Sequence, residues 1–337
     1  MRTRPRNIPE NTSISEMEPQ GGARAKHRRI TGLLLWAIGI GLYAACVSYI
    51  GWGRLRSAVA GVDLPIFLFM TAVTVAGLWV RVLKWRVALG RESGSTGAFF
   101  LSKAAGEWSP GRIGELSPLA LRRHRNARMA AWIVLDRILE MGVTLGLGIV
   151  GLLALKVPQR SFILLIAILL SAALLGLLVL LTRQQLFVGI ASRFTEGSLA
   201  RRILGLLASI SAETNTFICV SPQAVLLTVA AGCLDVWAGV LLYQAFHSEV
   251  TFTLMAAAKG VHAVASAIPF TPNATGVPYF ATAVLIHEVG GVPSDVLAAA
   301  IALSVVATTL VFWLSFGLGI LDVRGSSTHS GGSAQRE

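Results

Sequence analysis

Residues 99–116 read FFLSKAAGEWSPGRIGEL, an apolar stretch that is interrupted by charged residues, proline and glycine. A second stretch, AKGVHAVASAIPFTPNATGVP at residues 258–278, has a similar plan, with a lysine on an apolar helix and then a break rich in proline and glycine. Within lipid, irregular backbone is tolerated only where it is buried in protein or lines a water-filled cavity. In a membrane protein, the two stretches therefore indicate a polar site inside the bilayer.

The whole 337-residue chain has the composition of an integral membrane protein. Hydrophobic residues make up 54% and charged residues 14% of it, and its mean hydropathy is +0.67, far from the average soluble domain. Several apolar segments are long enough to cross a hydrocarbon core of about 30 Å. They are residues 30–52, 64–82, 130–155, 162–182, 224–246 and 296–321. We predict an all-α polytopic membrane protein with about six full transmembrane helices and two broken, re-entrant hairpins.

The net charge of +12 comes from arginines and lysines in the arms and loops beside these segments. This placement follows the positive-inside rule and argues against nucleic-acid binding. We predict a disordered basic cytoplasmic arm at residues 1–29, a transmembrane domain at 30–322 and a disordered cytoplasmic tail at 323–337. The first apolar run is longer than the 7 to 15 residues of a signal-peptide core, so we expect no cleavage. The protein is expected in the cell (inner or plasma) membrane with both termini cytoplasmic.

Basic clusters also predict the direction of the two hairpins. They follow the second span (Arg81, Lys84, Arg86 and Arg91) and the first broken stretch (Arg122, Arg123, Arg125 and Arg128). The first hairpin should thus enter and leave on the cytoplasmic face. Residues 251–292 contain one basic residue other than histidine, Lys259, so the second hairpin should enter from outside. The two halves would form an inverted repeat. Residues 203–220 mix leucines with polar residues and favour an interfacial amphipathic helix.

The first hairpin carries candidate ligands for an anion. Lys103 and Glu107 are four residues apart, share a helix face and can pair with each other; a purely structural salt bridge is the alternative. The guanidinium of Arg112 in the following break can hold phosphate oxygens in a bidentate fork, and the adjacent glycines allow backbone N–H groups to approach the same anion. Glu115 is placed to orient Arg112.

The span that begins at residue 130 carries Asp136, Arg137 and Glu140. Glu140 lies roughly 15 Å along the helix axis, near mid-membrane. Asp235 lies at the middle of its own span. Because an unpaired charge at that depth costs about 2.5 to 3.5 kcal/mol, each needs a partner or a wet cavity. A structural pair that holds two helices together is the alternative.

Lys259 and His262, three residues apart, add to these charged and polar residues from the second hairpin. The alternatives are that Asp235 only forms a hydrogen bond between packed helices and that His262 is a core histidine. Acids and bases nearly balance, which favours one polar cavity over separate structural pairs. The sequence has no phosphate-binding glycine loop, nucleophile elbow, paired-histidine zinc motif or CxxC. We therefore expect no enzyme activity, catalytic residue, metal or cofactor, and we interpret the three cysteines as packing residues.

Four motifs carry a resemblance to a known family: residues 84–86 (KWR), 110–115 (PGRIGE), Asp136-Arg137 with Glu140, and residues 272–277. In order and spacing they resemble the lysylphosphatidylglycerol synthase transmembrane-region family of flippase-like proteins, over about residues 30–322. In bifunctional members of that family this region is taken to flip an aminoacylated lipid that a separate soluble domain makes. We expect no such domain here. Asn273 lies in the second break, and Tyr279 stands where the family usually has an acid, so the resemblance does not identify the lipid headgroup.

From these residues we predict a lipid flippase or transporter that moves a polar or anionic lipid, either a phospholipid or a polyprenyl phosphate. An accessory subunit of an envelope glycolipid or cell-wall lipid synthesis complex is the alternative function. An intramembrane transferase acting on polyprenyl-linked sugars is a third. As protein partners we expect either further copies of the same chain, in a homo-oligomer, or a protein of envelope synthesis.

Overall fold

The computed structural model describes residues 52–90, 94–120, 127–155, 160–195, 198–217, 221–266 and 277–329. Throughout these ranges the secondary structure is helical, with no strand, which confirms the predicted all-α class. The helices are α2 (Trp52–Ala60), α3 (Leu64–Leu89), α4 (Ser95–Trp108), the 3₁₀ helix η2 (Pro110–Ala120), α5 (Ala127–Ala154), α6 (Arg160–Leu181), α7 (Gln184–Ala191), α8 (Leu199–Phe217), α9 (Ser221–Gln244), α10 (Phe252–Ser266), α11 (Val277–Gly290) and α12 (Ser294–His329).

Three helices of the described chain are long and apolar enough to cross a membrane: Leu64–Leu89, Ser161–Leu181 and Pro222–Gln244. The predicted spans at 130–155 and 296–321 fall on α5 and α12, of 28 and 36 residues. Nearly all of the predicted span at 30–52 lies outside the described residues. The exact number of spans therefore stays a prediction.

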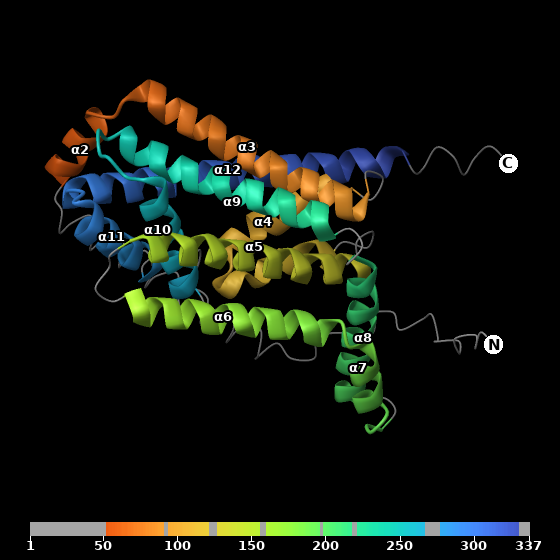
Figure 1. The fold of residues 1–337 in the computed structure, drawn as a ribbon. Coiled ribbons are helices and arrows are strands. Elements are labelled where there is room, and N and C mark those ends of the chain that lie inside the picture. The colour runs from red at the N-terminus through yellow and green to blue at the C-terminus, as the bar shows by residue number, and fades with distance from the viewer. Residues whose placement is uncertain are drawn as a thin grey trace, which may run out of the picture.

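The long helices α3, α5, α6, α9 and α12 run along one common direction, and α7 and α8 cross the end of this bundle where α6 finishes (Figure 1). The amphipathic segment predicted at 203–220 is a helix, α8, with an apolar side packed on α5. Neither α2 nor α7 was predicted as a separate helix. The apolar core consists mainly of one cluster on α9 to α12 and a second on α3 to α5.

The predicted break after Trp108 is the 3₁₀ helix η2, which folds back against α4. The Ser102 hydroxyl donates to the carbonyl of Glu115 at 2.7 Å, and the backbone N–H of Gly114 donates to Ser109 Oγ at 2.7 Å. A Cβ atom at Gly114 would collide with the backbone of Ala105, so only glycine allows this close approach. The break is thus an ordered turn that packs against its own helix.

The two hairpins start from opposite ends of the bundle, because α4 follows the end of α3 and α10 follows the end of α9, which runs the other way (Figure 1). The packing partners correspond as well: α3 contacts α9, α4 contacts α12, and α10 contacts α5. Exchanging α3 with α9, α4 with α10 and α5 with α12 maps this set of contacts onto itself. An inverted repeat produces this pattern, which supports the predicted repeat. The direction of each hairpin relative to a membrane stays a prediction.

Candidate functional site

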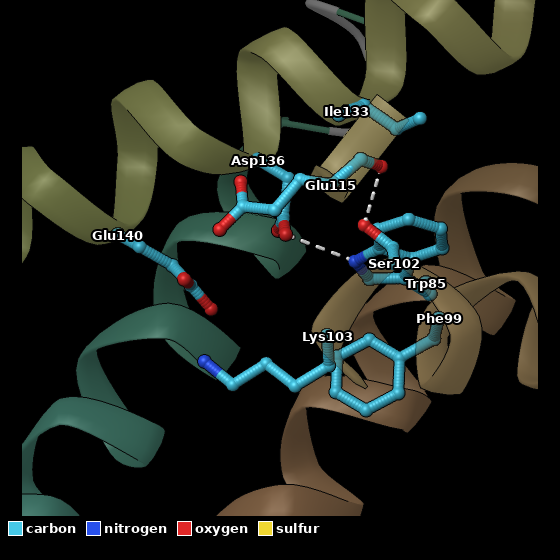
Figure 2. Close-up of a pocket in the computed structure, with 8 residues that line it drawn as sticks. All are labelled: Trp85, Phe99, Ser102, Lys103, Glu115, Ile133, Asp136 and Glu140. Carbon is cyan, nitrogen blue, oxygen red and sulfur yellow. Dashed lines mark hydrogen bonds between the residues drawn. The ribbon is translucent and has the colours of Figure 1, made fainter. Parts of the chain in front are cut away.

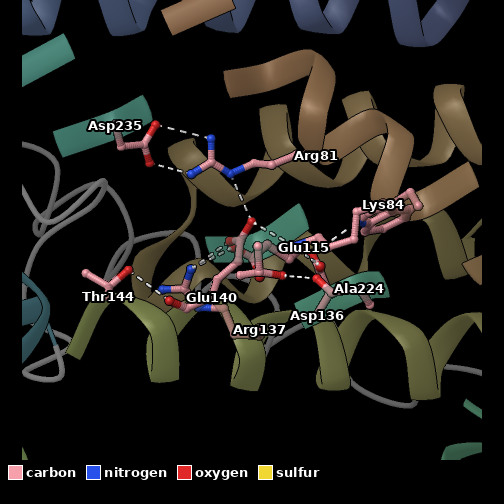
Figure 3. A network of polar contacts seen from close by, with 11 residues as sticks. Arg81, Lys84, Glu115, Asp136, Arg137, Glu140, Thr144, Ala224 and Asp235 are labelled. Atoms are coloured by element: carbon pink, nitrogen blue, oxygen red, sulfur yellow. Dashed lines mark hydrogen bonds and ion pairs between the residues drawn. The ribbon is translucent and has the colours of Figure 1, made fainter. Parts of the chain in front are cut away.

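Arg81 on α3 lies at the centre of a network of charged side chains that joins α3, α5 and α9. Its Nε donates to Oε1 of Glu140 at 3.1 Å, and Nη1 donates to Oδ1 of Asp235 at 3.2 Å. Nη2 donates to the second oxygen of Asp235 (Figure 3). This bidentate fork is the strongest geometry that an arginine and a carboxylate adopt. Since α3 and α9 belong to different halves of the predicted repeat, Arg81 links the two halves.

Lys84 lies one turn further along α3, and its side chain has no exposed surface. The Nζ atom is 2.5 Å from Oδ1 of Asp136 and 3.4 Å from Oε1 of Glu140. Trp85 holds the other oxygen of Asp136 through an Nε1–H bond of 2.9 Å. The partners that the sequence requires for Asp136 and Glu140 are therefore side chains of α3, and pairing makes these buried charges tolerable.

Arg137 connects the network to η2. Its Nη1 lies 3.7 Å from Oε1 of Glu115 and 3.9 Å from Oε2 of Glu140, the residue three positions later on the same helix. The three-residue spacing of Arg137 and Glu140 on one helix allows this contact. Glu115, predicted to orient Arg112, has Arg137 as a described partner; the side chain of Arg112 lies outside the described part of the structure.

A small cavity of about 20 Å³ adjoins the network, enough for at least one water molecule. The side chain of Lys103 extends across it towards Glu140, and the rings of Trp85 and Phe99 meet edge to face with their centroids 5.6 Å apart (Figure 2). Its lining comprises Trp85, Phe99, Ser102, Lys103, Glu115, Ile133, Asp136 and Glu140. A few converging polar groups on an apolar wall are typical of ligand pockets.

The remaining predicted residues belong to the two breaks. Lys259 on α10 is close enough for its charge to act on that of Asp235. The His262 ring packs edge to face against Tyr279 across the second break, with the centroids 5.2 Å apart. Asn273 and the side chain of Glu107 lie outside the described residues. The structure thus groups Lys103, Glu115, Asp136, Arg137, Glu140 and Asp235 in one site, with Lys259 at its edge and His262 and Tyr279 together on the second hairpin.

Sequence reasoning missed Arg81 and Lys84 as site residues. Both were assigned to a basic cluster at the end of a span at residues 64–82, whereas α3 continues to Leu89 and both side chains form ion pairs within the bundle. The signal for a longer helix was present: Val82, Trp85 and Leu89 continue the apolar pattern at helical spacing and are buried. The partners of the two cations come from α5 and α9, so their burial is a tertiary feature.

The fold and this network define a polytopic α-helical membrane protein with paired charges among its spanning helices. Residues 35–317 match the model of the family described as lysylphosphatidylglycerol synthase TM region. The chain therefore belongs to this family and is a membrane protein of lipid-related function. Comparisons with curated proteins and with solved structures give no match.

Proposed function

We propose that the chain binds a polar or anionic lipid at the charged cavity and moves it across the membrane. The observation that carries the proposal is the bridge made by Arg81 between Glu140 and Asp235, one carboxylate on each half of the bundle. Buried ionic groups can often be replaced by apolar residues without loss of stability. Charges kept inside transmembrane segments are therefore most readily explained by binding or transport.

The described charges of the site balance. Among the described residues, Arg81, Lys84, Lys103 and Arg137 face the four carboxylates Glu115, Asp136, Glu140 and Asp235. An anionic headgroup at the cavity competes with these carboxylates for the same cations. Lys103 lines the cavity, and Arg112 and Lys259 on the two hairpins add positive charge for the lipid phosphate, while the acyl tails stay in the bilayer.

This competition supplies a means of coupling binding to movement. A phosphate that takes up hydrogen bonds of Arg81 or Lys84 weakens the link between α3 and α9 or between α3 and α5. The two halves then separate more easily on the side from which the lipid arrived. Asp136, Glu140 and Asp235 pair with the cations again when the lipid leaves, or engage an amine where the headgroup has one.

The test is lipid translocation by the purified chain in proteoliposomes. The probes are a fluorescent phosphatidylglycerol and a fluorescent polyprenyl phosphate, which share the phosphate and differ in the rest of the lipid. We expect Arg81→Gln and Glu140→Gln to slow translocation of the accepted lipid at least tenfold, and Arg56→Gln, on exposed α2 surface, to leave it within twofold of wild type. If both network variants fold normally and translocate as fast as wild type, the mechanism is wrong.

A different result would favour the alternative function. If the wild-type chain translocates neither probe and co-purifies with a stable lipid-synthesis enzyme, the role of accessory subunit replaces that of transporter. Translocation by the isolated chain excludes this outcome, because an accessory subunit has no such activity alone.

A further inference from the structure

The segment from Arg183 to Phe217, comprising α7, α8 and their connection, leaves the helical bundle at one end. Both helices lie across the direction of the long helices and extend beyond α6 (Figure 1). The last turns of α8 are fixed to the bundle, where Ile210 and Phe217 are buried against α5 and its neighbours. The amide of Asn215 also donates to the carbonyl of Thr182 at 3.2 Å. Much of the rest of α7 and α8 is exposed within the described part of the structure.

This exposed surface is apolar over much of its length. Leu199 is 63% exposed and Ile203 is 44% exposed, and their spacing of four residues places these two apolar side chains on one side of α8. The other exposed large apolar side chains of the segment are Leu186, Val188, Ile190, Phe194 and Leu206. An apolar patch of this kind normally marks a surface that contacts another molecule or a membrane.

The charges of the same segment are mainly positive. Residues 183–217 contain four arginines and two glutamates, a net charge of 4 − 2 = +2. Arg183, Arg193 and Arg202 are exposed, and Arg201 is half-buried. Arg86 and Arg128, at the end of α3 and the start of α5, lie at this same end of the bundle. Guanidinium groups recognise phosphate oxygens in a bidentate fork, which is the chemistry of an anionic phospholipid headgroup.

We propose that α7 and α8 form a foot that lies in the headgroup layer of the membrane and binds anionic phospholipids. The long helices set the membrane normal, so two helices that cross them lie near the membrane plane. The exposed apolar side chains then enter the acyl boundary, as in other interfacial helices. The arginines contact anionic headgroups, which attract basic residues next to a membrane. This surface is separate from the charged cavity, and the proposal does not depend on lipid translocation.

The test measures which lipid lies beside the foot in the full-length chain. Cys46, Cys219 and Cys233 are replaced by alanine, and Leu206→Cys receives a bimane fluorophore. The protein is placed in nanodiscs of equal parts phosphatidylcholine and phosphatidylglycerol, with brominated acyl chains on only one lipid at a time. Leu165→Cys on α6, a residue that is 55% exposed on a spanning helix, is the matched label position away from the foot.

We expect brominated phosphatidylglycerol to quench the label at residue 206 at least twofold more than brominated phosphatidylcholine. The triple variant Arg193→Gln, Arg201→Gln and Arg202→Gln should bring this ratio to about one, and so should high salt, because exposed charges are screened over about 10 Å at 0.1 M. Arg56→Gln should leave the ratio unchanged, and the ratio at residue 165 should be the same with and without the triple variant.

Two results would overturn the proposal. If neither brominated lipid quenches the label at residue 206, the foot lies in water. Equal quenching by the two lipids in the wild-type chain would mean that the arginines select no anionic headgroup, since the apolar face alone would then account for the contact.

Discussion

At the scale of single residues, Arg81 satisfies two carboxylates at once, one on α5 and one on α9. Arg81→Gln removes the charge and leaves the mostly buried Glu140 and the partly exposed Asp235 short of a partner. We expect the free energy of unfolding to fall by about 3 to 5 kcal/mol, as for other broken buried pairs. Unfolding in bicelles, followed by steric trapping, measures this change.

Asp235→Asn tests whether the loss comes from the pair itself. In the double variant Arg81→Gln/Asp235→Asn one of the stranded charges is gone, so part of the stability returns. We expect a coupling free energy of at least about 1 kcal/mol in the double-mutant cycle, within the range for residues in contact. Additive losses would show that Arg81 and Asp235 contribute independently, contrary to the bidentate geometry.

Trp85 offers a second test at the same scale. The indole N–H donates to Asp136, and the ring is 2% exposed. Trp85→Phe keeps an aromatic ring but removes the donor, so we expect a loss of about 1.5 to 3 kcal/mol, the range for hydrogen bonds to charged groups. Trp79→Phe is the matched control because Trp79 is 49% exposed on the same helix, and a surface substitution changes stability by about 0.5 kcal/mol or less. Equal losses in the two variants would contradict the assigned role of the hydrogen bond.

At the scale of helices, the contact between α5 and α10 depends on Gly148. A Cβ atom there would collide with the backbone of Gly260 on α10. Gly148→Ala should therefore push the helices apart and cost about 1 to 3 kcal/mol, the range for overpacked cores. Thermal unfolding in detergent, monitored by the fluorescence of a thiol-reactive dye, measures the effect.

Gly146 provides the control for this helix contact. It lies two residues away on α5, and a Cβ atom there meets nothing within 4 Å. Gly146→Ala should be neutral or stabilising by up to about 1 kcal/mol, because alanine favours a helix more than glycine does. If Gly148→Ala is as well tolerated as Gly146→Ala, the close crossing of α5 and α10 is not needed for the fold.

At the scale of the whole molecule, the helical class and the two breaks could be predicted from the sequence. The length of an apolar segment and the positions of proline and glycine determine the local backbone structure without any tertiary contact. Asp136, Glu140 and Asp235 could be predicted as charges within the helical bundle because each interrupts an apolar run. Arg81 and Lys84 could not, because basic residues at the end of a span usually mark the cytoplasmic boundary. Only the tertiary contacts of α3 with α5 and α9 show that these two cations are paired and buried.

The pairing of α3 with α9 also supplies a test of relative motion between the two halves. A Cβ atom built on Gly77 lies 3.6 Å from Cβ of Leu234. This distance is within the range of about 3.5 to 4.5 Å between the two Cβ atoms of a disulfide. With the native cysteines replaced, Gly77→Cys/Leu234→Cys should form a disulfide on oxidation, detectable as an altered fragment pattern after proteolysis. If α3 and α9 separate during translocation, the cross-link abolishes it, and a reductant restores it.

The single variants Gly77→Cys and Leu234→Cys, treated with the same oxidant, are the controls and should keep their translocation rates. A cross-linked protein that still translocates at the rate of its reduced form would show that α3 and α9 move as one body. The change of pairing at Arg81 could then not open the contact between α3 and α9. Movement would have to occur instead between α4 and α12 or between α5 and α10, the other two contacts that join the halves.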